Sequence, residues 1–500
     1  MKKKFLSNLL LLVFLNLLIK PFWFFGIEVA VQNRVGEAMY GFYFSLFNFA
    51  FILNILLDFG ITNFNNRAVS RDPSRLKTHL AGIVPLKFML SVFYAIVVFT
   101  TGALIGYSEV QFRLLAILVL NQFLSSFILY LRSNISGLQL FRTDSLLSVL
   151  DRSLMILING ILLWSSITST PYQIEWFVYS QTASYMITLG MVLGIVLYHS
   201  GKIRLEFKRA VYLRILRQSY PFAILILLMS FFNRIDSVMI ERLLCDGQEQ
   251  AGIYAQSFRV LDALSQFAVL FAALLLPMFS KMLKAQEKTE ASEKTEAKTG
   301  EKALERIEER TEDLVRISSS LLLAVAVSVA VAGIFFNDEI IRLMYHETEL
   351  NSPAIFSILM GGFVFISLSY IYGTLLTANR NLKQLNLLAG ATVIINITLN
   401  LLLIPAYKAY GAAIASIASQ AFYAIGQVVL AHRILRLDLG LSVYGRLLLY
   451  GVIVLGGGFA LQHFLSWVPA ILLFIAFSGI TAILSGLVRP AEMRSIFWEE

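Results

Sequence analysis

Three basic residues and two aspartates stand inside long apolar segments of this chain. The basic residues are Lys20, Arg234 and Arg259, and the acidic residues are Asp236 and Asp262. An ionised group in hydrocarbon is costly, so such residues usually face a cavity or pair with an opposite charge. Arginine presents several donors in a planar fork and keeps its charge, which suits phosphate groups. Lys20, Arg234 and Arg259 could therefore hold a diphosphate or a similar anion.

These charges also have a purely structural interpretation. Arg234 and Asp236 fall in one apolar segment and Arg259 and Asp262 in the next, at similar depths. Antiparallel neighbours could bring the four together as internal ion pairs, with each aspartate neutralising an arginine. If the basic residues instead bind a ligand, the aspartates would neutralise the arginines in an empty cavity and could exchange H⁺ or Na⁺. Both interpretations stay open.

Long helices must position these charges. The chain has 500 residues, of which 57% are hydrophobic and 15% charged. Its apolar stretches are long enough to cross a bilayer, and at that length only a helix satisfies the backbone hydrogen bonds within the segment. We therefore predict an all-α integral membrane protein with about fourteen transmembrane helices. The predicted spans are residues 5–27, 39–62, 80–105, 112–131, 147–168, 175–198, 218–240, 251–280, 314–336, 353–377, 385–404, 411–431, 442–463 and 469–488.

The apolar pattern occurs twice, with matching landmarks. Gly41-Phe42-Tyr43 and Gly252-Ile253-Tyr254 are separated by an offset of 211, whereas Asn159 and Asn400 are separated by 241. The difference of 30 is the length of a charged insertion at 284–313. Duplicated six-helix halves are typical of membrane transporters. We predict a first lobe at 1–217, a second lobe at 218–441, and two further helices with a cytoplasmic tail at 442–500.

Under this duplication the charges are concentrated in the second lobe and Lys20. At the offset of 211, Asn48 and Phe51 correspond to Arg259 and Asp262. Such asymmetry suits a ligand with one anionic end and one bulky neutral end. Lys87 lies only about 12 Å inside the third predicted span. We expect its side chain to extend toward the cytoplasm.

The insertion 284–313 mixes both signs of charge, often four residues apart, and has few large apolar residues. This composition favours a solvated helical linker that extends the flanking spans. A regulatory or partner-binding segment is the alternative. We expect Thr299 and Gly300 to interrupt the helix.

Basic residues predict the orientation. Only Arg34, Arg113, Arg242, Arg342 and Lys408 fall in the segments on one side, and the segments on the other side hold far more Lys and Arg. By the positive-inside rule both termini are cytoplasmic, and the first span is too long for a cleaved signal. The net charge of +9 then faces anionic lipid, so no nucleic-acid partner is needed.

Catalytic motifs are not found in the sequence. The predicted external loops are too short to form a domain, and no phosphate-binding loop, metal motif or catalytic triad stands out. The single Cys245 excludes an intrachain disulfide and a cysteine metal cluster. We expect a non-enzymatic protein with no catalytic residues, no metal and no cofactor.

Two short motifs resemble a known family. Asp58-Phe59-Gly60, followed by Arg67, is similar to the pattern after the second helix of polysaccharide flippases, and Arg34-Val35-Gly36 with Tyr40-Gly41-Phe42-Tyr43 resembles their preceding loop. These are the O-antigen and capsule repeat-unit flippases of the multidrug/oligosaccharidyl-lipid/polysaccharide (MOP) exporter superfamily. The family-motif positions in this chain are Arg34, Asp58, Gly60 and Arg67.

The resemblance implies two lobes that open alternately to each face of the bacterial inner membrane. It implies an undecaprenyl-diphosphate-linked oligosaccharide as substrate, with membrane lipids, a polysaccharide polymerase and chain-length machinery as partners. A cation-coupled multidrug exporter and a lipid II flippase of the same superfamily remain alternatives. The exporters usually carry a buried acid in the first helix, where this chain has Glu28 at the outer end. The lipid II branch typically has a basic residue inside the second helix, which is missing here.

Overall fold

The computed structural model describes residues 15–16, 18–165, 170–201, 203–207, 209–293, 297–346, 349–435, 437 and 441–489. Every regular element in this part of the chain is a helix. It contains 11 helices that are long and apolar enough to cross a membrane, or 12 if the bent pair Leu18–Ile52 and Asn54–Arg71 is one span. The predicted all-α multi-pass membrane fold is thereby confirmed. Residues 5–14 and 17 of the first predicted span lie outside the described residues.

Two backbone breaks fall between predicted spans. The helix α13 (Leu382–Leu435) has 54 residues, so it would extend about 80 Å, far more than the hydrocarbon thickness of a bilayer. In its middle Lys408 has φ 52° and ψ −134°, which separates the predicted spans 385–404 and 411–431. Gly36, with φ 79° and ψ 168°, similarly breaks α2 (Val29–Ile52). That break separates the first and second predicted spans.

The chain forms two compact units. The first comprises Met1–Ala255 and Met344–Glu347, and the second comprises Gln256–Leu343 and Thr348–Glu500. The predicted lobes describe a duplication, which these units do not test, so the lobe boundaries stay a prediction.

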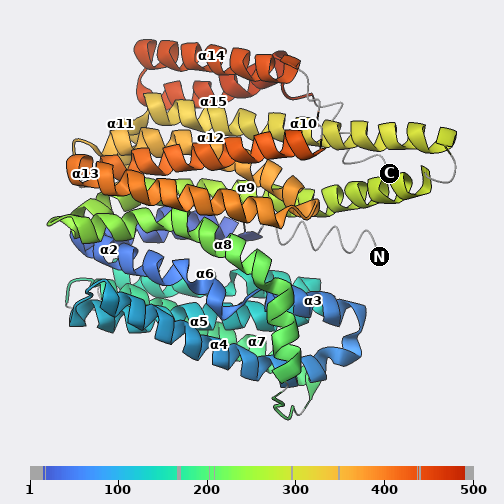
Figure 1. Cartoon of the computed structure of the whole chain (residues 1–500). Coiled ribbons are helices and arrows are strands. Elements are labelled where there is room, and N and C mark those ends of the chain that lie inside the picture. Colours follow the sequence, from blue (N-terminus) through green and yellow to red (C-terminus); the bar gives the residue numbers. More distant parts are fainter. Residues whose placement is uncertain are drawn as a thin grey trace. The chain divides into compact units, whose positions relative to one another are not determined.

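In the first unit, α5 occupies the centre and packs against α2, α3 and α7, while α8 packs on α2. Figure 1 shows α8 sharply bent, and Pro221 lies inside it; proline removes a helical hydrogen bond and favours such a kink. The elements are η1 (Trp23–Glu28), α2, η2 (Asn54–Leu57), α3 (Ile61–Arg71), η3 (Pro73–Arg75), α4 (Leu76–Leu104), α5 (Glu109–Gly137), α6 (Phe141–Trp164), α7 (Ile174–Ser200) and α8 (Arg209–Leu243).

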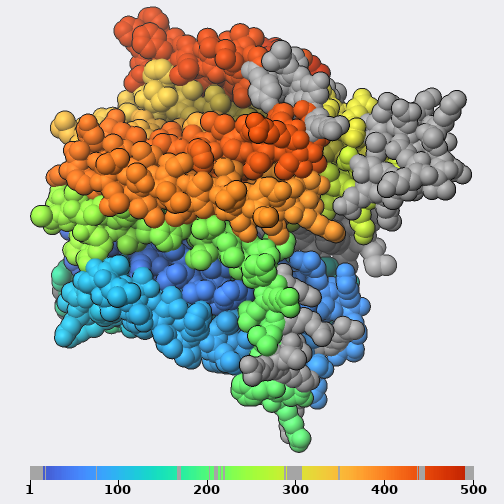
Figure 2. All heavy atoms as spheres, in the orientation of Figure 1, coloured from blue at the N-terminus to red at the C-terminus, as the bar shows by residue number. Residues whose placement is uncertain are grey.

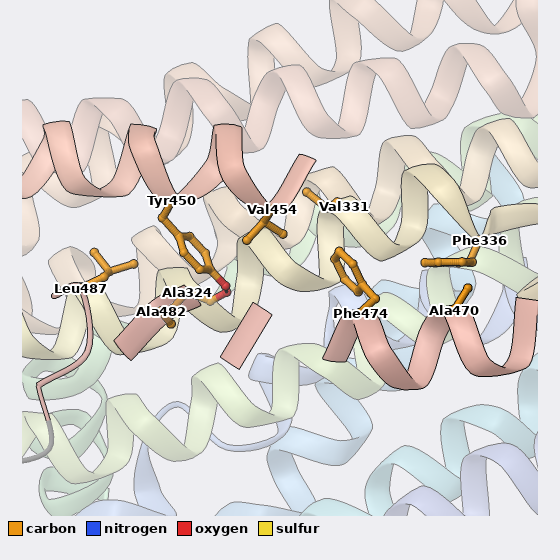
Figure 3. Close-up of a cluster of buried hydrophobic side chains, with 9 residues drawn as sticks. All are labelled: Ala324, Val331, Phe336, Tyr450, Val454, Ala470, Phe474, Ala482 and Leu487. Carbon is orange, nitrogen blue, oxygen red and sulfur yellow. The ribbon is translucent and has the colours of Figure 1, made fainter. Parts of the chain in front are cut away.

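In the second unit, α12 packs against α10 and α13, and α14 packs against α10 and α15. Figure 3 shows Tyr450 of α14 directed toward Ala324 of α10, within a cluster of buried apolar side chains that α15 completes. The elements are α9 (Gly247–Glu293, which begins in the first unit), α10 (Ala297–Phe335), α11 (Asn337–Met344), α12 (Ser352–Ala378), α13, α14 (Leu441–Phe464) and α15 (Trp467–Leu484).

Many large apolar side chains remain exposed, as expected for a surface that contacts lipid. On α13, which forms a broad orange surface in Figure 2, they include Leu387, Ile394, Leu402 and Ile425. In water such a surface would be an aggregation hazard, whereas in a bilayer the acyl chains cover it.

The charged insertion is helical on both sides of residues 294–296, which lie outside the described part. The helix α9 continues to Glu293 and α10 begins at Ala297, as expected for a linker that extends the flanking spans. The expected interruption at Thr299 and Gly300 is wrong, because both residues lie inside α10. One glycine costs a helix only about 1 kcal/mol, which the surrounding Ala, Glu and Lys residues can offset.

Candidate functional site

The predicted site residue Lys20 lies near charges that the sequence analysis did not single out. Lys20 is exposed, and Arg152 and Asp151 on α6 and Arg132 on α5 are close enough for their charges to act on its amine. Arg132 is itself paired with Asp144, at 2.9 Å between Nε and Oδ1. Lys20 and Arg152 therefore repel each other, and an anion between them would relieve that repulsion.

Aromatic side chains hold Arg152 in place. Its guanidinium lies 5.4 Å from the centre of the Trp23 ring, and the indole nitrogen of Trp23 donates to Oε1 of Glu28 at 3.1 Å. Trp23 also stacks on Phe177 of α7, with ring centres 5.7 Å apart. Trp23 and Glu28 are the two ends of η1, a π-helical turn, and such turns are frequent at functional sites. Glu28 is buried and its charge acts on Arg152.

Arg234 contacts α2 through two side chains. Its Nη1 donates to Oδ1 of Asn48 at 3.0 Å, and its guanidinium lies 4.3 Å from the centre of the Phe51 ring. Asn48 and Phe51 are the two positions that correspond to Arg259 and Asp262 under the predicted duplication.

Asp236 lies on a different face of α8 from Arg234, because two residues along a helix turn it by about 200°. Asp236 is buried, and it accepts a hydrogen bond from the Tyr254 hydroxyl at 3.0 Å. Arg259 is buried and Asp262 is half-buried, and both belong to the second unit. The convergence of Lys20, Arg234 and Arg259 on one anion therefore stays a prediction.

The family-motif residue Asp58 forms an ion pair with a buried lysine. Its Oδ1 lies 2.6 Å from the amine of Lys87 on α4, and Lys87 is only 1% exposed. The expectation that Lys87 extends toward the cytoplasm is wrong. The position of Lys87 near the end of its predicted span suggested that its amine could reach the membrane surface. The sequence did not show that the carboxylate of Asp58 lies beside it.

The other motif positions are a glycine before α3 and two exposed arginines. Gly60 has φ 78° and precedes the first residue of α3, a conformation that favours glycine. Arg67 is exposed on α3, and Arg34 is exposed two residues before the break at Gly36.

A further buried charge lies at the end of α8. Glu241 accepts from Gln111 Nε2 of α5 at 2.8 Å and pairs with Arg242, at 2.6 Å between Oε2 and Nε. Arg242 also donates to the carbonyl of Gly106 at 3.2 Å. The sequence offered a signal for this pair, and for Asp151 with Arg152, because each has adjacent opposite charges at the edge of or inside an apolar span.

These helices, and the charges among them, define a multi-pass membrane protein. Residues 5–283 match the family described as polysaccharide biosynthesis protein, which is more than half of the 500 residues. The chain belongs to this family. No curated protein matches the chain.

Solved structures share the fold at low sequence identity. The lipid II flippase MurJ, in an inward closed conformation, matches with a TM-score of 0.63 and 13% identity, covering 98% of this chain and 99% of that chain. An inward-facing multidrug resistance MATE transporter of the MOP superfamily matches with a TM-score of 0.56 and 13% identity, covering 83% and 94%. A mutant of the Vibrio cholerae MATE transporter VcmN matches with a TM-score of 0.55 and 13% identity, covering 86% and 98%. The predicted resemblance is confirmed at the level of the polysaccharide biosynthesis family, and the solved structures show that the chain shares its fold with the lipid II flippase and with MATE transporters.

Proposed function

We propose that this protein is a flippase that moves undecaprenyl-diphosphate-linked oligosaccharide repeat units across the bacterial inner membrane by alternating access, for surface polysaccharide biosynthesis. The family match carries the proposal, because it connects the chain to polysaccharide biosynthesis over residues 5–283. The similarity in fold to the lipid II flippase and to MATE transporters supports transport rather than catalysis.

The basic side chains inside the spans support an anionic substrate. Lys20, Arg234 and Arg259 are our candidates for binding the diphosphate, and Arg152 joins them because it acts on the Lys20 amine. Arginine can donate to several phosphate oxygens at once, and its charge persists at every physiological pH. Asp236 and Asp262 are candidates for charge neutralisation in the empty state or for coupling to H⁺ or Na⁺.

Two other substrates fit the same fold. Organic cations, the cargo of a multidrug exporter, would be repelled by the adjacent cations Lys20 and Arg152. Lipid II carries a diphosphate like the proposed substrate, so charge alone does not distinguish the two. The family description favours a polysaccharide repeat unit over a peptidoglycan precursor. In the cell we expect both termini in the cytoplasm, with a polysaccharide polymerase and chain-length machinery as partners on the outer side.

Deletion of the gene tests the proposal. We expect loss of a surface glycan and accumulation of lipid-linked oligosaccharide on the cytoplasmic leaflet, with restoration by a plasmid copy. Sensitivity to cationic dyes should stay at the parental level once envelope leakiness is measured separately. Normal surface glycan with raised dye sensitivity would reject the flippase in favour of the exporter. Arrest of peptidoglycan synthesis would favour lipid II.

A further inference from the structure

The segment between α2 and α3 leaves a backbone carbonyl without its helical partner. In a continuous helix the Ile61 N–H would bond to the Leu57 carbonyl, but it donates to the Asp58 carbonyl instead, at 2.8 Å. Phe59 and Gly60 both have positive φ, at 47° and 78°. A separate bend of 50° lies a few residues earlier, between the segments Leu18–Ile52 and Asn54–Arg71.

The amine of Lys87 contacts three oxygen atoms, two of which belong to the irregular segment 57–60. It donates to the Leu57 carbonyl at 3.0 Å, to Oδ1 of Asp58 at 2.6 Å and to the Ser126 hydroxyl at 3.1 Å. The ring centre of Tyr130 lies 5.8 Å away. One carboxylate, one main-chain carbonyl and one hydroxyl thus converge on a single positive charge.

Asp58 also holds the start of α3. Its Oδ1 and Oδ2 accept from the Thr62 backbone N–H at 3.3 and 3.4 Å, and the Thr62 hydroxyl donates to Oδ1. The carboxylate therefore connects the beginning of α3 to Lys87 on α4. Because a half-buried carboxylate is destabilised when it loses its charge partner, the Lys87 ammonium stabilises the charge of Asp58.

We propose that the three oxygen atoms around Lys87 form a site of the kind that binds an alkali-metal ion. The Lys87 ammonium, which is part of the chain, occupies this site in place of such an ion. Broken membrane helices offer free carbonyls and carboxylates that coordinate Na⁺ in transporters, and hard cations take oxygen ligands of the kinds found here. In the wild-type protein this site takes no ion from solution. Shortening the lysine leaves the three oxygens around a vacated space that a sodium ion, completed by water, can occupy. The inference does not depend on the proposed substrate.

The test compares the thermal stability of purified protein in sodium and in choline chloride at equal ionic strength. Lys87→Ala should melt several degrees lower than wild type in choline, and sodium should raise its midpoint saturably, by about 3 °C or more. Wild type should melt at the same temperature in both salts. The exposed Lys77 on the same helix supplies the matched control, because Lys77→Ala should show no sodium effect.

A double variant, Lys87→Ala with Asp58→Asn, removes both the cation and the charge that requires it. It should fold and show no response to sodium. If Lys87→Ala is too unstable to melt, its folded yield from membranes extracted in each salt replaces the midpoint. An equal melting temperature or yield of Lys87→Ala in the two salts, with the double variant folded, would overturn the proposal. A sodium response in wild type equal to that of Lys87→Ala would overturn it as well.

Discussion

Gly41 of α2 and Gly252 of α9 lie so close that neither position has room for a side chain. A Cβ added to Gly41 would lie 2.4 Å from the Gly252 nitrogen and 1.8 Å from the Gln248 carbonyl oxygen, and one added to Gly252 would lie 2.1 Å from the Glu37 carbonyl oxygen. These glycines are the landmarks of the predicted duplication, at the offset of 211. The duplication itself stays a prediction, whereas the close crossing of the two helices at these glycines is a feature of the structure.

The close crossing of α2 and α9 predicts that neither glycine can be replaced by a larger residue without loss of stability. Gly41→Ala or Gly252→Ala forces backbones apart, and overpacking of this kind costs about 1–3 kcal/mol. We expect a lower thermal midpoint for both variants in detergent. Gly82 on α4 is the control, since a Cβ there meets nothing within 4 Å. Equal midpoints for Gly41→Ala and Gly82→Ala would contradict the close crossing.

A second prediction concerns the charge around Lys20. Lys20→Gln and Arg152→Gln should each reduce surface polysaccharide at least tenfold while membrane levels stay unchanged, because each removes a proposed diphosphate contact. Arg113, exposed at the start of α5, serves as control, and Arg113→Gln should leave polysaccharide at the wild-type level. Full polysaccharide in the Lys20→Gln and Arg152→Gln strains would exclude these two residues from substrate binding.

Arg234 needs a different control because of its neighbours. Arg234→Gln should abolish surface polysaccharide, and the double variant Arg234→Gln with Asp236→Asn should not restore it. Since Arg234→Gln also removes the contacts of the guanidinium with Asn48 and Phe51, thermal midpoints must be measured beside transport. Restoration of polysaccharide by the double variant would assign Arg234 a structural role.

The packing of α14 and α15 on α10 makes a prediction about stability alone. The Tyr450 hydroxyl lies 2.7 Å from the Ser328 hydroxyl and donates to the Ala324 carbonyl at 3.2 Å. Tyr450→Phe leaves these buried groups with fewer hydrogen-bond partners and should lower the free energy of unfolding by about 1 kcal/mol. Tyr198→Phe, on an exposed side chain, should cost nothing measurable. A thermal midpoint for Tyr450→Phe equal to that of wild type would contradict the hydrogen bonds.

The native cysteine tests the predicted orientation. Cys245 is exposed in the predicted outer turn after α8, so a membrane-impermeant maleimide added to spheroplasts should label it. Moving the thiol to the exposed Lys284, by Cys245→Ser with Lys284→Cys, should abolish labelling until the membrane is permeabilised. The opposite pattern would invert the topology.

Much of the fold could be predicted from the sequence because each span must be long enough to cross the bilayer and must form its backbone hydrogen bonds within itself. The breaks at Gly36 and Lys408 fall between predicted spans for this reason. Thr299 and Gly300 show the limit, since local helix propensity differs by too little to place an interruption.

The candidate site was less accessible from sequence. Lys20 could be selected because a lysine in an apolar span is conspicuous, but its neighbour Arg152 could not be paired with it without knowing that α6 approaches η1. Asp58 was recognised through a family motif, whereas its partner Lys87 lies 29 residues away. Helix spacing relates residues along one helix, and contacts between helices depend on packing that apolar periodicity does not encode.

Transport by the purified protein in liposomes tests the central claim most directly. The substrate is an undecaprenyl-diphosphate-linked oligosaccharide placed in both leaflets, with access of an added glycosidase to the inner-leaflet sugar as the signal. We predict that wild-type protein exposes the inner pool, that Lys20→Gln with Arg152→Gln does so far more slowly, and that a cationic dye is not moved. Dye movement without any exposure of the inner lipid-linked pool would contradict the flippase and establish a drug exporter in its place.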